Sequence, residues 1–146
     1  MAEIAHLRVD LAVEELQVAI ELFLSGRSDV AALTLAGAAE ESLGQAVKLQ
    51  GGQNALQQHF EIASSVHHAR SRTLLKWQTF ADGENYARNA AKHVNEAGQT
   101  VTVDVRRAAQ WMIVRAVTNY DRLGLLQSEL MLAFGKWFYE NEVDGQ

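Results

Sequence analysis

The segment Asp29 to Gln50, DVAALTLAGAAEESLGQAVKLQ, decides the fold because it predicts a long helix with one unusually slim face. The residues of that face repeat at helical spacing and leave little side chain in the middle: Leu33, Gly37, Glu40, Gly44 and Val47. Such a face lets a neighbouring backbone approach closely when helices pack ridge into groove. Glu40 is its odd member, a carboxylate between two glycines.

The segment before it, about Glu3 to Leu24, predicts an amphipathic helix of about six turns. Its apolar residues recur at three- and four-residue spacing: Val9, Val13, Leu16, Ile20 and Phe23. Gly26 supplies a left-handed stop, and Ser28 with Asp29 caps the next helix. Two long helices joined by so few residues are expected to pack antiparallel as a hairpin.

Further helices are expected over about Asn54 to Arg72, Glu84 to about Gly98, Asp104 to about Leu123, and Leu125 to Tyr139. The segment Thr73 to Phe80 either continues the third helix or forms a short one of its own. Thr100 to Val103 alternates like a strand but is too short and unpartnered to predict a sheet. We therefore predict an all-α protein, an antiparallel up-and-down bundle of about five to six helices. Residues 1–146 form one domain, with a core over about 3–139.

Two finer expectations concern breaks and aromatic residues. Asp82 and Gly83 are expected to break the chain before the fourth helix, with Asp82 as its N-cap. Trp77, Trp111 and Trp137 have aliphatic neighbours at helical spacing, which favours core positions over exposed stacking platforms. The apolar last helix either closes the core of one chain or covers a partner chain, in keeping with a homodimer.

Composition narrows the class of protein. The 146 residues include no cysteine and no proline, so disulfides, thiolate metal sites and a cysteine nucleophile are excluded. No apolar run reaches the roughly 20 residues needed to span a bilayer, and the N-terminus has no signal-peptide core. A soluble cytoplasmic protein without membrane contact is the expectation. The net charge of −5 argues against a dedicated binder of long duplex nucleic acid.

The charge is unevenly distributed along the chain. Residues 1–65 hold nine acids and three bases (−6), residues 66–93 two acids and five bases (+3), and residues 94–146 seven acids and five bases (−2), which sums to −5. The basic block contains Arg70, Arg72, Lys76, Arg88 and Lys92.

The end of that block overlaps the segment Glu84 to Asn95, ENYARNAAKHVN. This is the one stretch whose residue types suggest a reactive site more than helix packing. Arg88 and His93 lie five apart on a helix and diverge by about 140°, whereas Asn89 and His93 share a face. Arginine can clamp phosphate oxygens while histidine moves a proton at a ribose 2′-hydroxyl or a leaving oxygen. These residues suit phosphodiester cleavage without a metal.

A structural interpretation competes with the catalytic one. His93 falls on a stripe with Tyr86, Ala90 and Ala97, so it could be a satisfied core residue. Arg88 would then pair with Glu84 one turn earlier, a surface ion pair of small energetic effect.

Arg88, Asn89 and His93 resemble the arginine, polar residue and histidine motif of the HEPN superfamily, and Ala32 to Gly44 resembles its alanine-rich early helix. The resemblance implies a helical bundle that dimerises and cleaves RNA without metal, the motifs of two chains lining one cleft. It implies a toxin or defence setting in which RNA and a cognate antitoxin are partners. The chain departs from the family's pattern in its acidic net charge and in the two predicted helices that follow the motif.

The candidate site therefore has three tiers. Arg88, Asn89 and His93 are catalytic candidates, and Lys92, Arg70 and Arg72 are candidates for RNA phosphate contacts. The supporting candidates are Glu40, as a buried polar partner of the motif, with Glu84 and Tyr86. His67 and His68 are adjacent and point about 100° apart on a helix, which makes them poor joint ligands, so neither a metal site nor another cofactor is expected. The alternative function is a non-enzymatic helical module that dimerises or binds a partner.

Overall fold

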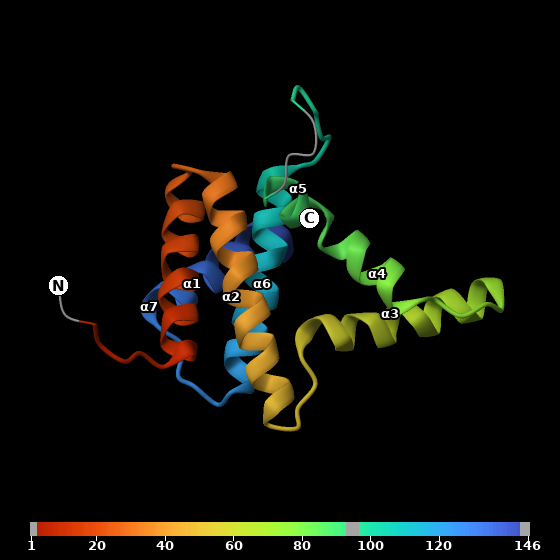
Figure 1. The fold of residues 1–146 in the computed structure, drawn as a ribbon, viewed down its shortest axis with the longest axis horizontal. Helices are drawn as coiled ribbons and strands as arrows, with labels where there is room; N and C mark the ends of the chain where they lie inside the picture. Colours follow the sequence, from red (N-terminus) through yellow and green to blue (C-terminus); the bar gives the residue numbers. More distant parts are fainter. Residues whose placement is uncertain (1–2, 93–96, 144–146) are drawn as a thin grey trace.

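The computed structural model describes residues 3–92 and 97–143, and every regular element within them is a helix (Figure 1). The seven α-helices and one short π-helix are α1 (Arg8–Ser25), α2 (Asp29–Leu49), α3 (Ala55–Ser71), α4 (Trp77–Glu84), α5 (Tyr86–Lys92), α6 (Val105–Arg122), α7 (Glu129–Phe138) and η1 (Tyr139–Val143). The all-α class is confirmed. The predicted count of five to six helices is too low, because the segment after α3 forms a short helix of its own, α4, which is separate from both α3 and α5.

Three helices form the core: α1, α2 and α6 lie side by side, with α2 in contact with both of the others (Figure 1). The alanines of α2 allow this close packing, since Ala32, Ala36 and Ala39 are fully buried. Larger side chains from α1 and α6, such as Leu16 and Ile113, fill the remaining space.

α1 and α2 are antiparallel, but α6 runs parallel to α2, since Arg106 at its start bonds to Asp29 and Asn119 near its end bonds to the Glu40 carbonyl (Figure 1). The expected up-and-down arrangement of neighbouring helices therefore holds for the α1–α2 hairpin and not for α2 and α6.

The α1–α2 hairpin follows its sequence signals. Gly26 adopts the left-handed conformation (φ 71°), and its N–H bonds to the carbonyl of Phe23. The Ser28 hydroxyl accepts a hydrogen bond from the Ala31 N–H at 3.1 Å, which confirms the predicted cap. The first helix starts later than expected, at Arg8, because the exposed residues 3–7 add no side chain to the core.

The last helix closes the core of its own chain. Phe134 and Trp137 of α7 pack edge-on against Phe23 of α1, with ring centroids 5.7 and 4.8 Å away. The guanidinium of Arg106 covers the same phenylalanine ring at 4.1 Å. Core positions for the other two tryptophans were a wrong prediction, since Trp77 and Trp111 are each 41% exposed.

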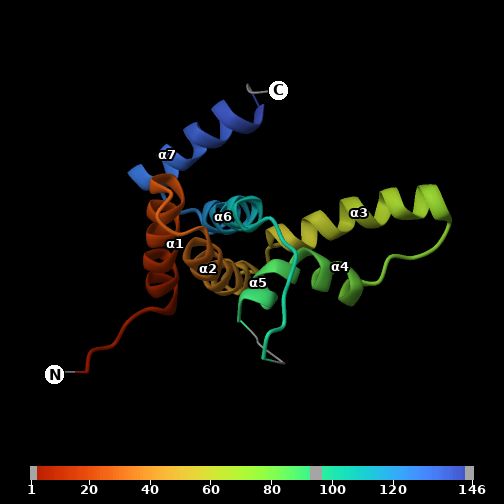
Figure 2. The same ribbon diagram turned by 90° about the horizontal axis from the view of Figure 1, so that it is seen from above.

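α3 and α4 leave the core and together form an arm, residues 55–84 (Figures 1 and 2). α3 projects away from the three core helices, and α4 runs back towards them. Asn54 and Gln57 form a capping box at the start of α3. α4 begins at Trp77 and includes Asp82 and Gly83, so the predicted break at these residues is wrong and lies at Asn85 instead.

α5 brings the chain back against α2. The fourth predicted helix is described only as far as Lys92, and its expected end near Gly98 follows residues that lie outside the described part. Residues 99–104, which include the strand-like segment, have neither helical nor strand structure. None of the helices in the described ranges combines the length and apolar character needed to cross a membrane.

Candidate functional site: a buried carboxylate shared by two arginines

The site begins with the contact between α5 and α2. Arg88 of α5 lies over Gly37, where a β-carbon would come within 2.7 Å of the arginine Cγ. The slim face of α2 therefore accommodates the stem of an arginine side chain, not the neighbouring backbone that its glycines predict. A residue of any other type at position 37 would compete with Arg88 for the same space.

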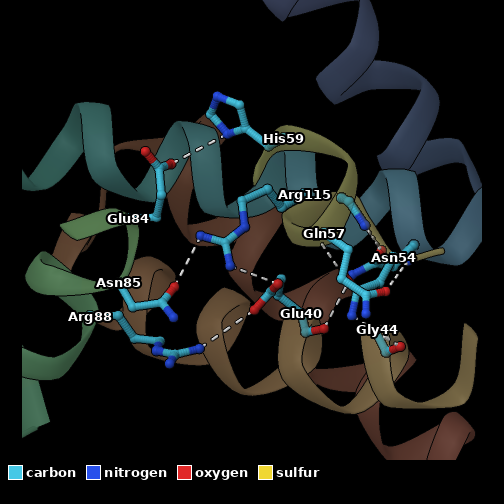
Figure 3. A network of polar contacts seen from close by, with 11 residues as sticks. Glu40, Gly44, Asn54, Gln57, His59, Glu84, Asn85, Arg88 and Arg115 are labelled. Atoms are coloured by element: carbon cyan, nitrogen blue, oxygen red, sulfur yellow. Dashed lines mark hydrogen bonds and ion pairs between the residues drawn. The ribbon is translucent and has the colours of Figure 1, made fainter. Parts of the chain in front are cut away.

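Glu40, one turn further along α2, receives two guanidinium groups (Figure 3). Its Oε1 accepts a hydrogen bond from Nη2 of Arg115 at 2.7 Å, and its Oε2 accepts one from Nη1 of Arg88 at 3.5 Å. The three side chains are only 6, 10 and 11% exposed, respectively for Glu40, Arg115 and Arg88. Two guanidinium groups facing one carboxylate leave a local excess of one positive charge.

Two asparagines hold this cluster in place. Arg115 donates a second hydrogen bond, from Nη1 to Oδ1 of Asn85 at 3.1 Å, which ties it to the junction of α4 and α5. Asn119 donates to the backbone carbonyl of Glu40 at 3.3 Å and accepts from the Ala55 N–H at 2.8 Å. This one buried amide therefore connects α2, α3 and α6, and most polar groups of the cluster are satisfied.

The cluster also contains unused donors. The Nε atoms of Arg88 and Arg115 are buried and have no hydrogen-bond partner in the described part of the chain. A buried donor without a partner carries a desolvation cost.

Two of the predicted catalytic residues, Arg88 and Asn89, point in different directions from α5. Arg88 points inward to Glu40 (Figure 3), whereas Asn89 is on the exposed side of α5. Lys92, at the end of the same helix, is exposed. His93 lies outside the described residues.

The remaining predicted residues lie apart from the cluster or at its margin. The alternative pairing of Arg88 with Glu84 is wrong, because Glu84 faces Nδ1 of His59 at 3.5 Å. Tyr86 is exposed at the start of α5. Arg70 and Arg72 are exposed at the far end of α3, away from α5 (Figure 1).

Sequence reasoning missed Arg115, Asn119 and Asn85. A signal was present for the first two, since Arg115 and Asn119 are four apart and continue the helical face of Ala108 and Met112. Polar residues in register with an apolar face indicate a buried polar contact. Their partner, Glu40, could not be inferred from spacing along the chain.

A groove of about 540 Å³ lies beside the cluster, between α3 and α6. We call it the α3–α6 groove. Its lining includes Ile62, Trp111, Val114 and Arg115. His59 and Glu84, whose side chains face each other, also line it. In the described ranges, no three histidine, aspartate or glutamate side chains come close enough together to hold a metal ion.

Comparisons with protein-family models, with curated proteins and with solved structures find no match to this chain. The cluster must therefore be interpreted from its own geometry and chemistry.

Proposed function

We propose that the protein is a metal-independent endoribonuclease in which Arg88 binds an RNA phosphate and His93 moves the proton. The R-N-x3-H spacing and its resemblance to HEPN nucleases motivate this proposal. The observation that carries it is the sharing of one buried carboxylate by two arginines.

Because Glu40 has two arginine partners, it would still have one if Arg88 turned away from it. A buried carboxylate that loses its only partner destabilises a protein strongly. Glu40 would keep the shorter, 2.7 Å bond to Arg115 if Arg88 turned from its 3.5 Å contact towards a phosphate. The guanidinium fork of Arg88 matches the geometry of phosphate oxygens, and the local excess of positive charge favours an anion. Arg88 can therefore exchange one anionic partner for another without leaving Glu40 unpaired.

The proposed reaction uses the ribose itself as the nucleophile. The 2′-oxygen attacks phosphorus, the bond from phosphorus to the 5′-oxygen breaks, and a 2′,3′-cyclic phosphate forms. One proton leaves the 2′-hydroxyl and one reaches the departing 5′-oxygen, and His93 serves one of these transfers. Arg88 holds the charge that develops on the phosphate oxygens, and the exposed Asn89 orients the group.

Lys92, exposed on the same helix, is the nearest candidate for a further phosphate contact in this proposal. Arg70 and Arg72 at the end of the arm would contact only a longer RNA. The resemblance favours a toxin or defence setting with a cognate antitoxin.

The direct test is cleavage of single-stranded RNA in the presence of a chelator. We expect the wild type to cleave, and Arg88→Ala and His93→Ala to lose most activity while keeping a helical circular dichroism spectrum. His6→Ala, at an exposed position before α1, is the matched control and should cleave like the wild type. An inactive wild type, or an equally active His93→Ala, would overturn the proposal.

A second candidate function, a non-enzymatic helical interaction module, is favoured by the arm. α3 has a single buried residue, Leu56, although it spans 17 residues. In such a module Arg88→Ala would lower stability through the loss of a buried contact and would change no activity. RNA cleavage measured beside thermal unfolding therefore separates the two functions.

A further inference from the structure

A trough lies along α3, between that helix, the segment that returns from it to α4, and the end of α2. It consists of two adjoining hollows of about 580 and 490 Å³, which share Phe60 and Glu61 in their walls. Lys48 and Trp77 line the first hollow, and Leu74 lines the second. We call the two hollows together the arm trough. Its lining has no residue in common with that of the α3–α6 groove.

The first hollow has an aromatic wall. The indole of Trp77 packs against Phe60 and Phe80, with ring centroids 5.2 and 6.3 Å away, and it is still 41% exposed. These contacts hold the ring in place and leave part of its surface open to a ligand. An exposed ring of this kind is a platform on which a nucleobase can stack.

Basic side chains surround the aromatic wall. Lys48 lines the first hollow, Lys76 directly precedes Trp77, and Arg72 caps the end of α3; all three basic residues are exposed. Among the described residues that line the trough, Glu61 is the only acid. Three bases and one acid give +2 here, in a chain of net charge −5. A local positive charge in an acidic protein attracts a polyanion to this surface.

We propose that the arm trough binds single-stranded RNA, with one base stacked on Trp77 and phosphates near Lys48 and Lys76. The shape of the trough suits an extended ligand, because Gln57 and His68, which line its two hollows, are eleven positions apart on α3, or about 16 Å. In a duplex the bases are already stacked on each other, so a single strand is the form that fits. The choice of RNA rests on the proposed nuclease function.

The concave shape also distinguishes a strand from a membrane. Exposed leucine, tryptophan and lysine side chains, such as Leu74, Trp77 and Lys76, also occur where proteins touch an anionic bilayer. A bilayer surface meets residues that protrude, however, whereas Trp77 lines a hollow. The trough therefore favours a flexible strand that can enter it.

The trough is separate from the cluster around Glu40. The eight residues of α4, about 12 Å of helix, lie between the start of that helix at Trp77 and α5, which carries Arg88. RNA held in the trough must therefore extend along the arm to reach Arg88. Binding in the trough and cleavage at Arg88 are distinct events that can be measured separately.

Fluorescence anisotropy measures binding without cleavage. The probe is a labelled 2′-O-methyl oligoadenylate of about eight nucleotides, within the range of single-strand binding sites. It lacks the 2′-hydroxyl that serves as nucleophile in the proposed reaction. Adenine is chosen because Gln53, exposed in the first hollow, has an amide that can both donate and accept at a base edge.

We expect the wild type to bind the oligoadenylate and Trp77→Leu to bind it about 5- to 100-fold more weakly, the effect of losing one stacked base. Trp111→Leu is the matched control, because that tryptophan is also 41% exposed but lines the α3–α6 groove. Its affinity should equal that of the wild type. Circular dichroism verifies that both variants fold.

The salt dependence of binding tests the phosphate contacts. Lys48→Gln and Lys76→Gln should each reduce the slope of log affinity against log salt by about 0.7, the value for one phosphate of a single strand. Arg27→Gln, exposed in the turn of the α1–α2 hairpin, is the control and should keep the slope of the wild type.

A wild type that does not bind the oligoadenylate, or a Trp77→Leu variant that binds like the wild type, would overturn the proposal. So would stronger binding to vesicles of phosphatidylglycerol and phosphatidylcholine than to the oligoadenylate. Cleavage of unmodified RNA is measured in parallel. Binding that depends on Trp77 in a protein that cleaves no RNA would refute the nuclease and support the trough, and cleavage without such binding would do the reverse.

Discussion

The side chain of Arg88 crosses directly over the backbone of Gly37, so α5 reaches α2 only because position 37 has no β-carbon. This contact fixes where α5 lies against α2. It also directs the arginine towards Glu40, one helical turn away on the same face.

Gly37→Ala is therefore expected to displace Arg88 and to destabilise the fold by roughly 1–3 kcal/mol, as overpacking of a filled site does. Urea denaturation measures this change. Gly135→Ala is the matched control, since that helical glycine in α7 has open space where a β-carbon would stand. Alanine there should be neutral or stabilising by up to about 1 kcal/mol. Equal effects at the two positions would contradict the proposed steric role of Gly37.

Glu40→Gln is expected to lower the free energy of unfolding by about 3–5 kcal/mol, because it leaves two buried guanidinium groups without a counter-charge. Its neighbour Glu41 is exposed, so Glu41→Gln should change stability by less than about 0.5 kcal/mol. Thermal and chemical unfolding of this adjacent pair measure the difference. A Glu40→Gln variant as stable as Glu41→Gln would show that the cluster contributes little.

Substitutions of the two arginines are expected to differ in their effect on the free energy of unfolding. Arg115→Gln should cost about 3–5 kcal/mol, since Arg115 makes the shorter bond to Glu40 and also holds Asn85. Arg88→Gln should cost roughly 1.5–3 kcal/mol, the range for one hydrogen bond to a charged group. Denaturation of the two variants under one condition gives the comparison. If Arg88→Gln were the more damaging change, Arg88 would not be the replaceable partner of Glu40.

Asn119→Ala is expected to loosen the start of α3. It removes the acceptor of the Ala55 N–H and the donor to the Glu40 carbonyl, at a cost of about 1–3 kcal/mol. Hydrogen exchange should accelerate at the first amides of α3 more than within α1. Asn141→Ala, whose side chain is exposed and bonds to the Trp137 carbonyl within the same helical segment, is the comparison and should leave that exchange unchanged. Unaltered protection of Ala55 in Asn119→Ala would refute the proposed anchor.

The expectations that succeeded rest on local chemistry. The stop at Gly26 and the cap at Ser28 involve residues within a few positions of each other, so the chain itself specifies them. The break expected at Asp82 failed because α4 continues through Gly83. Polar residues that mark turns elsewhere are tolerated in an exposed helix of the arm.

Glu40 shows most clearly which contacts cannot be predicted from spacing along the sequence. Its place between Gly37 and Gly44 marks it as unusual in the sequence, and the helix around it follows from local propensity. Its partners are 48 and 75 positions away, at Arg88 and Arg115. No periodicity relates residues so distant. The sequence suggested Glu40 as a buried polar partner of the motif, and the competing structural interpretation paired Arg88 with Glu84; the structure shows the contact with Glu40.

The sequence by itself therefore determined the long helices α1, α2, α3 and α6, the turn and cap between the first two, and the slim face of α2, because these depend on neighbours within about one or two turns. The tertiary structure alone decided that Arg88 and Arg115 meet at Glu40, and that α3 projects with Ile62 uncovered. Those features depend on how α5 and α6 pack against α2 and on where the chain turns at Asn54. Packing of this kind is set by the fit of side chains across the whole core, which local spacing does not encode.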